Sequence, residues 1–418
     1  MFKRIPGTKD ILPEEVASWQ RLEKISRDIF SVFNYQEIRT PLIESASLFN
    51  RSLGENTEIV QKQMFIIQNK EGLYALRPEA TASIVRAYIE NNLDMVRKFV
   101  KLYYSGPMFR LERPQKGRLR QFHHIGAEAI GSYDPNLDVE VISLLDSLLR
   151  GFSIKDYKIK INSLGCAKDR EKLKQILEKS LKSKLSKLCA DCKIRFKKNI
   201  LRILDCKQRE CQEMLRGLGI EEKYLCSDCD EHFIDVKKGL DKVGIGYEVV
   251  PYLVRGLDYY TRTVFEVTHK DLGAQDALGA GGRYDNLISE LGGDDIGAIG
   301  FALGVERLLL IAGSTSQARS PQIVYLITLG EKAKNQGLQL LDSFRKENIA
   351  CDTDYEAKSL KGAMRQANDL GARFVLILGD DELKKNVVTL KDMNSGTQEE
   401  VRIDGIISKI KLNLEPRT

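Results

Sequence analysis

The sequence contains no long apolar run. Its continuous apolar segments, of which residues 374–378 are an example, are far shorter than the roughly 20 residues that a helix needs to cross a bilayer. The first ten residues carry early charge and no apolar core, so they do not form a secretory signal. We therefore predict a cytoplasmic protein without a membrane-spanning segment.

Two common nucleotide-binding patterns are also missing. No Gly-x-x-x-x-Gly-Lys-Ser/Thr segment is present, and the glycines of residues 279–282 do not open a helix after a strand with the dinucleotide-binding spacing. The chain has no internal repeat and no low-complexity tract. The sequence therefore excludes a P-loop protein, a Rossmann-type dinucleotide-binding protein and a repeat protein.

No sign of charge dominates the chain as a whole. The net charge of +6 is mild, so it permits a polyanionic partner without proving one. Within residues 168–198, however, Lys and Arg outnumber Asp and Glu by 12 to 4. Such a segment is either a solvated helix face or a contact to a phosphate backbone, and the sequence leaves both interpretations open.

Length and pattern divide the chain into parts. A chain of 418 residues exceeds one ordinary core, so we expect two or three domains. Residues 1–320 predict an α+β domain built on an antiparallel sheet flanked by helices, interrupted at residues 165–235 by a mainly helical, Cys-containing insertion. After a Ser/Thr/Gly linker at residues 313–320, the β-α-β-α-β pattern of residues 321–418 predicts a doubly wound α/β domain.

The periodicity of apolar residues places the individual elements. In the first domain we predict helices at residues 14–33, 78–91, 138–149 and 305–311, and strands at 65–68, 72–76, 101–110, 122–131, 264–268, 277–281 and 298–303. In the second we predict strands at 322–328, 349–353 and 374–378 and helices at 332–346 and 360–370. Residues 111–120 are polar and basic, so we expect a hairpin whose loop presents cations.

Six of the eight cysteines lie in one segment of the insertion, residues 189–229, and the eight cysteines do not suggest a secreted disulfide scaffold. Two Cys-x-x-Cys pairs, Cys189 with Cys192 and Cys226 with Cys229, could together form a four-cysteine structural Zn²⁺ site. Reduced, partly buried thiols are the alternative. In either case the cysteines brace the insertion, and we assign no metal ligand to the chemistry.

Arginines mark a possible anion site. Arg110 ends a strand and leads into a loop with Arg118 and Arg120, and guanidinium groups bind phosphate or carboxylate oxygens in pairs. Arg307 stands near the start of an apolar helix, where the helix dipole also favours an anion. An exposed basic loop and an ordinary surface ion pair are the alternatives.

Two further segments carry polar groups that a ligand could use. Residues 254–263 combine two adjacent tyrosines with Arg255 and Asp258, although tyrosines in such a place are often core residues. Glu79 lies in the first turn of a helix, where a carboxylate either caps the helix or holds a ligand ammonium.

The order of these motifs resembles that of the class II aminoacyl-tRNA synthetases, and specifically the histidyl-tRNA synthetase family. Residues 38–44, 106–123 and 300–307 are similar to the three class motifs, the first of which is the dimer-forming one. Residues 253–260 and 280–285 are similar to the two motifs of the histidine enzymes. The resemblance covers almost the whole chain.

The resemblance implies a histidine–tRNA ligase that forms histidyl-adenylate from L-histidine and ATP with Mg²⁺, then transfers histidine to tRNA(His). It also implies a homodimer whose terminal domain binds the anticodon. The catalytic residues implied are Arg110, Arg255 and Arg307, of which Arg255 stabilises charge at the α-phosphate. Those implied to bind ATP are Arg110, Glu112, Arg118 and Arg307. Arg113 and Gln115 are implied to reach the tRNA acceptor end.

The histidine site implied by the resemblance is larger. Glu79 and Thr81 would engage the substrate amino group, and Glu128 and Tyr260 would bind the imidazole. The remaining members of the implied histidine site are Ala80, Arg110, His124, Arg255, Tyr259 and Tyr284.

This chain departs from the usual family pattern at two of these positions, and other functions remain as alternatives. His124 stands where the family usually has glutamine, and histidine can also donate or accept a hydrogen bond. Ala80 stands where glycine is usual. Residues 321–418 carry equal numbers of basic and acidic residues, so anticodon binding rests on resemblance. The nearest rival is a synthetase-like regulatory subunit of ATP phosphoribosyltransferase, against which stand the three arginines and the appended domain. A more distant rival is an RNA-binding or structural protein with an inactive synthetase domain, which loss of these Arg or Glu residues would support, and none is lost.

Overall fold

The computed structural model describes residues 2–55, 57–115, 117–206, 208–219, 224–313, 323–356 and 359–414. It divides into two compact units, Met1–Thr315 and Ser316–Thr418. Most of the predicted linker at residues 313–320, and the first residue of the strand predicted at 322–328, lie outside the described residues. Among the described helices, none is long and apolar enough to cross a membrane.

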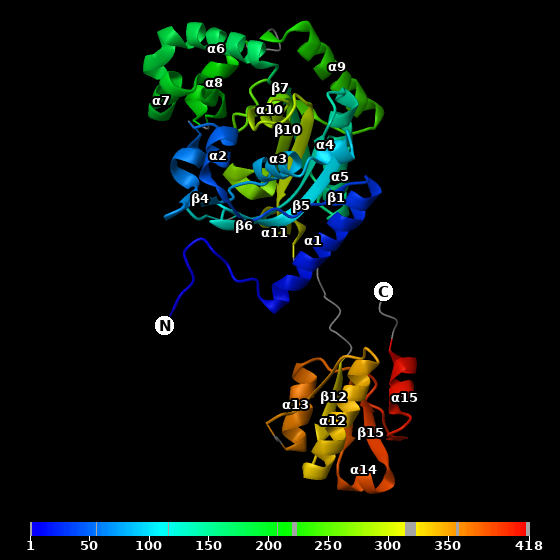
Figure 1. Cartoon of the computed structure of the whole chain (residues 1–418). Helices are drawn as coiled ribbons and strands as arrows, with labels where there is room; N and C mark the ends of the chain where they lie inside the picture. Colours follow the sequence, from blue (N-terminus) through cyan, green and yellow to red (C-terminus); the bar gives the residue numbers. More distant parts are fainter. Residues whose placement is uncertain are drawn as a thin grey trace. The chain divides into compact units, whose positions relative to one another are not determined.

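The first unit is built on an eight-stranded sheet with the strand order β1-β5-β6-β11-β10-β9-β7-β8 (Figure 1). All central neighbours pair antiparallel, whereas the two edge strands β1 and β8 pair parallel. The bounds are β1 Gln36–Glu37, β5 Val100–Phe109, β6 Gln121–Ile130, β7 Tyr157–Ser163, β8 Glu248–Val249, β9 Thr261–His269, β10 Ala277–Arg283 and β11 Ala298–Gly304. The predicted antiparallel α+β architecture is thereby confirmed.

The two faces of this sheet differ because side chains alternate along a strand. The odd-numbered residues Ile125, Ala127 and Ala129 of β6 and Ile299, Phe301 and Leu303 of β11 enter one apolar core. The helices α1 (Pro13–Val32), α5 (Pro135–Gly151) and α9 (Ser227–Lys242) supply the other side of this core. The even-numbered residues of the same strands, such as Glu128 and Gly300, lie on the opposite face.

A second layer covers part of that opposite face. It contains α2 (Ala46–Leu53), η1 (Ile59–Gln63), α3 (Thr81–Glu90), α4 (Leu93–Val96), α10 (Leu287–Glu290) and a small sheet of β2 (Ile43–Ser45), β3 (Phe65–Asn69) and β4 (Gly72–Leu76). These elements form their own apolar core, which includes Phe49, Tyr259 and Tyr284. The hairpin predicted at residues 65–76 is confirmed by the pairing of β3 with β4.

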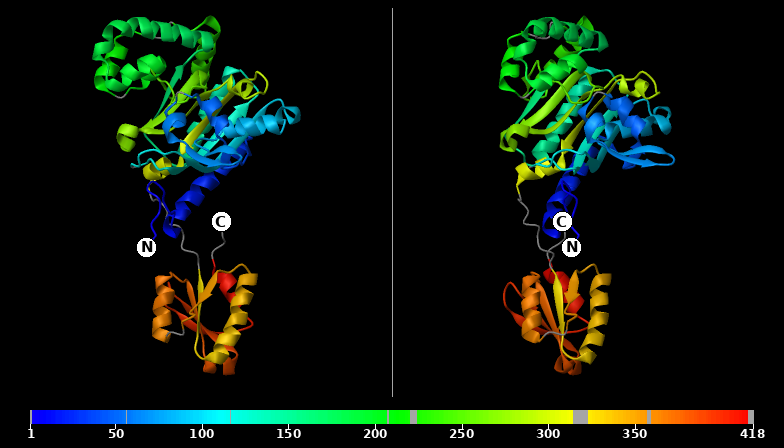
Figure 2. Two further views of the ribbon diagram at one scale, coloured as in Figure 1. Left: turned by 60° about the vertical axis from the view of Figure 1, so that its left-hand side comes forward. Right: turned by 90° about the vertical axis from the view of Figure 1, so that its left-hand side faces the viewer.

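The insertion lies at one end of the large sheet, at the top in Figures 1 and 2. It consists of α6 (Ala167–Leu181), η2 (Lys182–Lys187), α7 (Ala190–Lys198), η3 (Ile200–Asp205) and α8 (Arg209–Arg216). These helices share a small core in which leucines and cysteines meet. The chain then returns through α9 to pack against α5.

The second unit has a five-stranded sheet in the order β13-β12-β14-β15-β16. The predicted β-α-β-α-β pattern is confirmed, since β12 (Val324–Thr328) pairs parallel with β13 (Cys351–Thr353) and β14 (Phe374–Leu378). Helix α13 (Leu360–Asp369) covers one face, and α12 (Glu331–Lys346) and α15 (Ile406–Asn413) cover the other (Figure 2). Beyond the predicted part, α14 (Asp380–Lys385) leads to the antiparallel strands β15 (Val387–Asp392) and β16 (Gln398–Arg402).

Candidate active site

A cavity of about 430 Å³ opens on the face of the large sheet opposite to α1 and α5. Its walls come from β6, β9, β10 and β11, the start of α3, the segment of residues 254–260 and the start of α11 (Val305–Ala312). Twelve of the residues singled out in the sequence line it: Glu79, Thr81, Arg110, Glu112, Arg118, His124, Glu128, Arg255, Tyr259, Tyr260, Tyr284 and Arg307. Ala80 is buried beside the cavity, whereas Arg113 and Gln115 are exposed on the loop outside it.

Glu128 stands at the most polar point of the buried wall. Its Oε1 accepts a hydrogen bond from the Thr81 hydroxyl at 2.7 Å, and its Oε2 accepts one from the Tyr284 hydroxyl at 2.6 Å. Burial raises the pKa of Glu128 to about 8, even though both hydrogen bonds act in the opposite direction. A cationic or N–H donor ligand would stabilise the charged form of this carboxyl group, because burial and the negative charge of Glu79 both disfavour it.

Of the two roles considered for Glu79, capping a helix and holding a ligand ammonium, the structure shows the first. Its carboxylate accepts the backbone N–H of Thr81 at 2.7 Å and of Ala82 at 3.0 Å, so it caps the start of α3. It also faces the cavity, and burial raises its pKa. Each oxygen keeps a second lone pair, so capping does not prevent contact with a ligand ammonium.

The arginines gather at the other end of the cavity. Arg110 donates through Nε to the carbonyl of Pro78 at 2.9 Å and lies over the ring of Phe122 at 5.4 Å. Arg118 pairs with Glu112 at 3.1 Å, and Arg307 donates to the carbonyls of Gly117 and Ala277. These contacts fix the guanidinium groups in place, which suits binding of a polyanion.

Two buried polar atoms of the cavity wall have no hydrogen-bond partner within the described structure. They are Nε of Arg255 and Nδ1 of His124. Arg255 also pairs through Nη1 with Glu266 on β9. Unpartnered buried polar atoms are rare in folded proteins, so their position on a cavity indicates a ligand that completes their hydrogen bonding.

The charge of His124 follows from its surroundings. Burial, followed by the positive charges of Arg110 and Arg307, lowers the pKa of His124 to about 3. The ring is therefore neutral at physiological pH and offers one donor and one acceptor, as a glutamine amide does. The departure from the family pattern at this position thus preserves the hydrogen-bonding capacity of the usual residue.

Two tyrosines complete the aromatic wall. Tyr259 and Tyr260 pack with ring centroids 4.7 Å apart, and Tyr259 also meets Tyr284 edge to face at 5.8 Å. Burial raises the pKa of Tyr260 to about 12, so its hydroxyl keeps its proton and can donate. Tyr259 and Tyr260 are therefore both core residues and cavity residues, because they belong to an apolar core and also line the cavity.

The structure adds residues that sequence analysis missed. Glu266 and Tyr104 line the cavity, and Glu266 holds Arg255. Arg283 is fully buried, pairs with Asp138 at 2.5 Å and with Asp285 at 3.0 Å, and so fixes the strand end that carries Tyr284. A charged residue inside an otherwise apolar strand, as at Glu266 between Phe265 and Val267, was the available signal.

Gly300 permits the close approach of β11 to Glu128. A Cβ at this position would lie 1.7 Å from Oε2 of Glu128 and 2.6 Å from the carbonyl of Ala127. We therefore expect Gly300→Ala to displace Glu128 and to destabilise the fold by about 1–3 kcal/mol, measured by thermal unfolding. Gly304→Ala is the control, since its Cβ would meet nothing closer than Arg307 at 3.6 Å. Equal stability of the two variants would contradict this account of Gly300.

Of the two alternatives left open for the cysteines, a joint site formed by both Cys-x-x-Cys pairs is wrong, because the pairs lie in different groups. Cys189 and Cys192 lie with Cys206 and Cys211, whereas Cys226 and Cys229 lie with Cys166 and Asp169. The reason is that Cys226 and Cys229 begin α9, which packs on α5 rather than in the core of the insertion. The structure therefore contains two separate cysteine groups.

Comparison with known proteins places the chain among relatives of full length. Residues 7–308 match the family model described as histidyl-tRNA synthetase, and residues 323–413 match that of an anticodon binding domain. A histidine–tRNA ligase of Thermodesulfovibrio yellowstonii is 45% identical over 98% of both chains. That of Desulforamulus reducens is 46% identical over 97% of this chain and 98% of its own. The apo histidyl-tRNA synthetase of S. aureus is 35% identical with a TM-score of 0.81, covering 98% of this chain and 100% of its own.

Proposed function

Because the chain belongs to the histidyl-tRNA synthetase family, we propose that its cavity joins L-histidine to ATP and that the histidyl group then passes to tRNA(His). The family makes it an aminoacyl-tRNA synthetase that uses ATP and Mg²⁺. The observation that carries the assignment of the site is one cavity lined both by the buried carboxyl group of Glu128 and by arginines that their own contacts hold in place. A small polar ligand and a polyphosphate fit this division of charge.

In the first step a carboxylate oxygen of histidine bonds to the α-phosphorus of ATP while the bond to the leaving pyrophosphate breaks. Both reactants are anions, so cations must offset their repulsion and the charge of the transition state. We assign this work to Arg110, Arg255 and Arg307. Arg255 has an unpartnered Nε and is held by Glu266, so it can meet the α-phosphate without moving.

Histidine binding uses the opposite end. Glu128 would accept from one imidazole nitrogen, and Tyr260 or neutral His124 would donate to the other. Glu79 and Thr81 would hold the substrate ammonium, with Ala80 and Tyr259 behind them and Tyr284 orienting Glu128. A site built on paired donors and acceptors should reject side chains that leave these groups unpaired.

ATP would lie against Glu112, Arg118 and Arg307. The carboxylates of Glu112, Glu266 and Asp276 line the same region and are oxygen ligands of the kind that Mg²⁺ takes together with phosphates. When bound, Mg²⁺ neutralises phosphate charge. The arginines and Glu112 provide the orientation, since positioning is the main contribution of the protein to phosphoryl transfer.

In the second step a ribose hydroxyl of tRNA attacks the carbonyl of the adenylate and releases AMP. Arg113 and Gln115 are suited to the acceptor end because they are exposed on the loop at the cavity. Gln115 exchanges two backbone hydrogen bonds with Arg118, which lines the cavity. The second unit would bind the anticodon. We assign this activity to the cytoplasm, where translation takes place.

A homodimer is part of the proposal. Ile43, Ile66 and Leu73 expose large apolar side chains on the small sheet β2-β4-β3, next to the segment of residues 38–44 that is similar to the dimer-forming motif. Exposed apolar groups of this kind mark interaction surfaces. Light scattering should therefore give twice the chain mass of 47.3 kDa, and a single chain mass at micromolar concentration would contradict the dimer.

Histidine-dependent exchange of radiolabelled pyrophosphate into ATP tests the proposed function. Exchange with histidine alone, among the amino acids, supports it. Absence of exchange with every amino acid would favour the regulatory alternative. A Bacillus halodurans structure titled as an ATP phosphoribosyltransferase regulatory subunit/histidyl-tRNA synthetase is 22% identical, and that likeness supports only the fold.

A further inference from the structure

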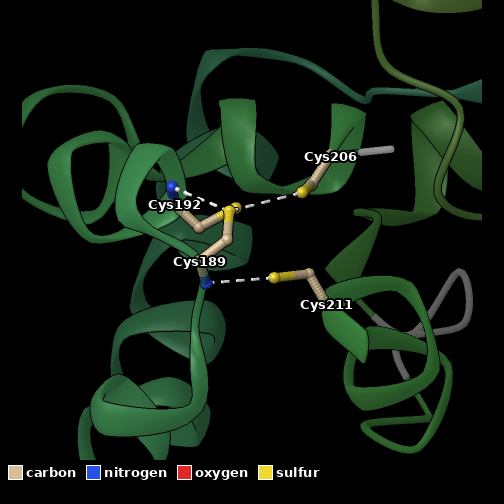
Figure 3. A group of neighbouring side chains, drawn as sticks. All are labelled: Cys189, Cys192, Cys206 and Cys211. Carbon is tan, nitrogen blue, oxygen red and sulfur yellow. Dashed lines mark hydrogen bonds between the residues drawn. The ribbon is translucent and has the colours of Figure 1, made fainter. Parts of the chain in front are cut away.

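Four cysteines converge in the core of the insertion. The Sγ atoms of Cys189, Cys192, Cys206 and Cys211 all lie within 4.8 Å of one another, and those of Cys189 and Cys206 are 3.8 Å apart. Figure 3 shows the side chains meeting from α7, from the end of η3 and from α8. A tetrahedral zinc site with Zn–S bonds of about 2.3 Å separates its sulfurs by about 3.8 Å.

We propose that Cys189, Cys192, Cys206 and Cys211 hold a structural Zn²⁺ ion. The spacing, Cys-x2-Cys followed by Cys206 and Cys211 after a short helical segment, resembles that of closed four-cysteine sites. This inference does not depend on the proposed function. It replaces the pairing expected from the sequence alone, in which Cys226 and Cys229 were the remaining two ligands.

Backbone N–H groups already support thiolate charge at these sulfurs. The N–H of Cys192 donates to Sγ of Cys189, that of Cys189 to Sγ of Cys211, and that of Gln208 to Sγ of Cys206, each at 3.4 Å. Metal ligands are usually held by such second interactions, which orient them and stabilise the deprotonated form. Zn²⁺ binding would release the thiol protons to solvent and leave a site closed on all sides.

Three alternatives to zinc account for the cluster less well. Thiols can fill a core as small apolar groups, but that role does not require four of them, from separate elements, to touch one another. Disulfides would join the sulfurs in pairs, yet all four cysteines are free, and a reducing compartment keeps them so. A multi-iron cluster binds its thiolates to different irons, so it would hold them farther apart than one ion does.

The second cysteine group carries no such proposal and serves as the control. The carboxylate of Asp169 there accepts the backbone N–H groups of Cys166 at 3.2 Å and Cys226 at 2.9 Å, so its two oxygens are used in capping α6 and joining α9. Cys226 is also exposed. Cys226→Ser therefore removes a thiol from the second cysteine group without changing any of the four proposed ligands.

The zinc site is joined to the cavity through the segment between its ligands. Arg202 donates to the carbonyl of Gly256 at 2.8 Å, and Asn199 donates to the carboxylate of Asp258 at 3.4 Å. Asp205, next to the ligand Cys206, lines the cavity itself. Zn²⁺ would therefore fix the segment that holds the loop carrying Arg255 and Tyr259. This last point rests on the proposed function.

The test is metal analysis of the full chain purified without added metal or chelator. One zinc per chain is expected, lost in Cys211→Ser and Cys206→Ser and retained in Cys226→Ser and Cys351→Ser. Since a ligand variant could fail to fold, the wild-type chain is also stripped and loaded with Co²⁺, whose visible spectrum reports tetrahedral thiolate coordination. A thiolate spectrum that survives Cys226→Ser supports the site.

Several outcomes would overturn it. They are absence of bound metal together with absence of the Co²⁺ spectrum, iron in place of zinc, or loss of the metal in Cys226→Ser but not in Cys211→Ser. Pyrophosphate exchange is measured separately. Exchange that falls on stripping and returns with Zn²⁺ supports the link to the cavity, unchanged exchange overturns that link alone, and absence of exchange in the zinc-loaded chain counts only against the proposed function.

Discussion

Replacing Arg255 by alanine should reduce histidine-dependent pyrophosphate exchange by at least about 10²-fold, because a fixed charge at the transition state contributes on that order. The side chain lines the cavity, and its partner Glu266 belongs to β9, which is held by its pairing with β10 and β7. We therefore expect the loss in kcat rather than in the melting temperature. Exchange rates and thermal unfolding of the same preparation make the distinction.

Arg113→Ala is the matched control for this result. Arg113 lies on the same side of the sheet but is exposed outside the cavity, so exchange should be unchanged while transfer to tRNA falls. Exchange near the wild-type rate in Arg255→Ala would remove Arg255 from the chemistry. A lower melting temperature with loss of exchange would make it a structural residue instead.

Glu128→Gln should raise the KM for histidine by roughly 10- to 100-fold, since a hydrogen bond to a charged group contributes about 1.5–3 kcal/mol. The KM for ATP is the internal control and should not change, because the residues proposed to bind ATP, Glu112, Arg118 and Arg307, do not include Glu128 or its hydrogen-bond partners. The amide keeps the shape of the carboxylate, and its oxygen can still accept from one of the two hydroxyls of Thr81 and Tyr284, while the other hydroxyl must turn to accept from the amide N–H. An equal change in both KM values would indicate a distorted cavity rather than loss of a histidine contact.

The same substitution should remove a pH dependence. Burial raises the pKa of Glu128 to about 8 in the free site, so the carboxylate that binds imidazole is a minor form at pH 7. As pH rises toward 8 this form increases, and kcat/KM for histidine should rise by up to about tenfold per pH unit and then level off. In Glu128→Gln the rise should be absent, while the titration of histidine itself is common to both. A parallel rise in the two proteins would assign it to the substrate.

The sequence predicted the antiparallel sheet because its strands alternate and its hairpin loop is polar, both of which are local signals. Membership of the cavity was predicted for residues such as Arg110 and Glu128 through the order of motifs rather than through any one of them. Glu266 was not predicted as a cavity residue, because nothing near it in the sequence shows that β9 passes beside Arg255. Pairing across strands that are distant in sequence is set by the fold alone.

The cysteines illustrate the same limit. Spacing in the sequence paired Cys189 and Cys192 with Cys226 and Cys229, because equal motifs suggest equal roles. The structure separates them, since α9 leaves the insertion to cover the large sheet. The Cys-x-x-Cys spacing indicates that each pair can bind a metal, but the path of the chain decides which cysteines lie together.

The alternation along β6 and β11 divides each strand between two tasks. Odd positions such as Ile125 and Leu303 belong to the apolar core under α1 and α5, and even positions such as Glu128 and Ala302 line the cavity. A substitution at Ala302 therefore changes the cavity wall without removing a residue of that core, whereas Gly300, also an even position, has no room for a side chain. Insertion of a single residue in either strand would exchange the two faces and destroy stability and activity together.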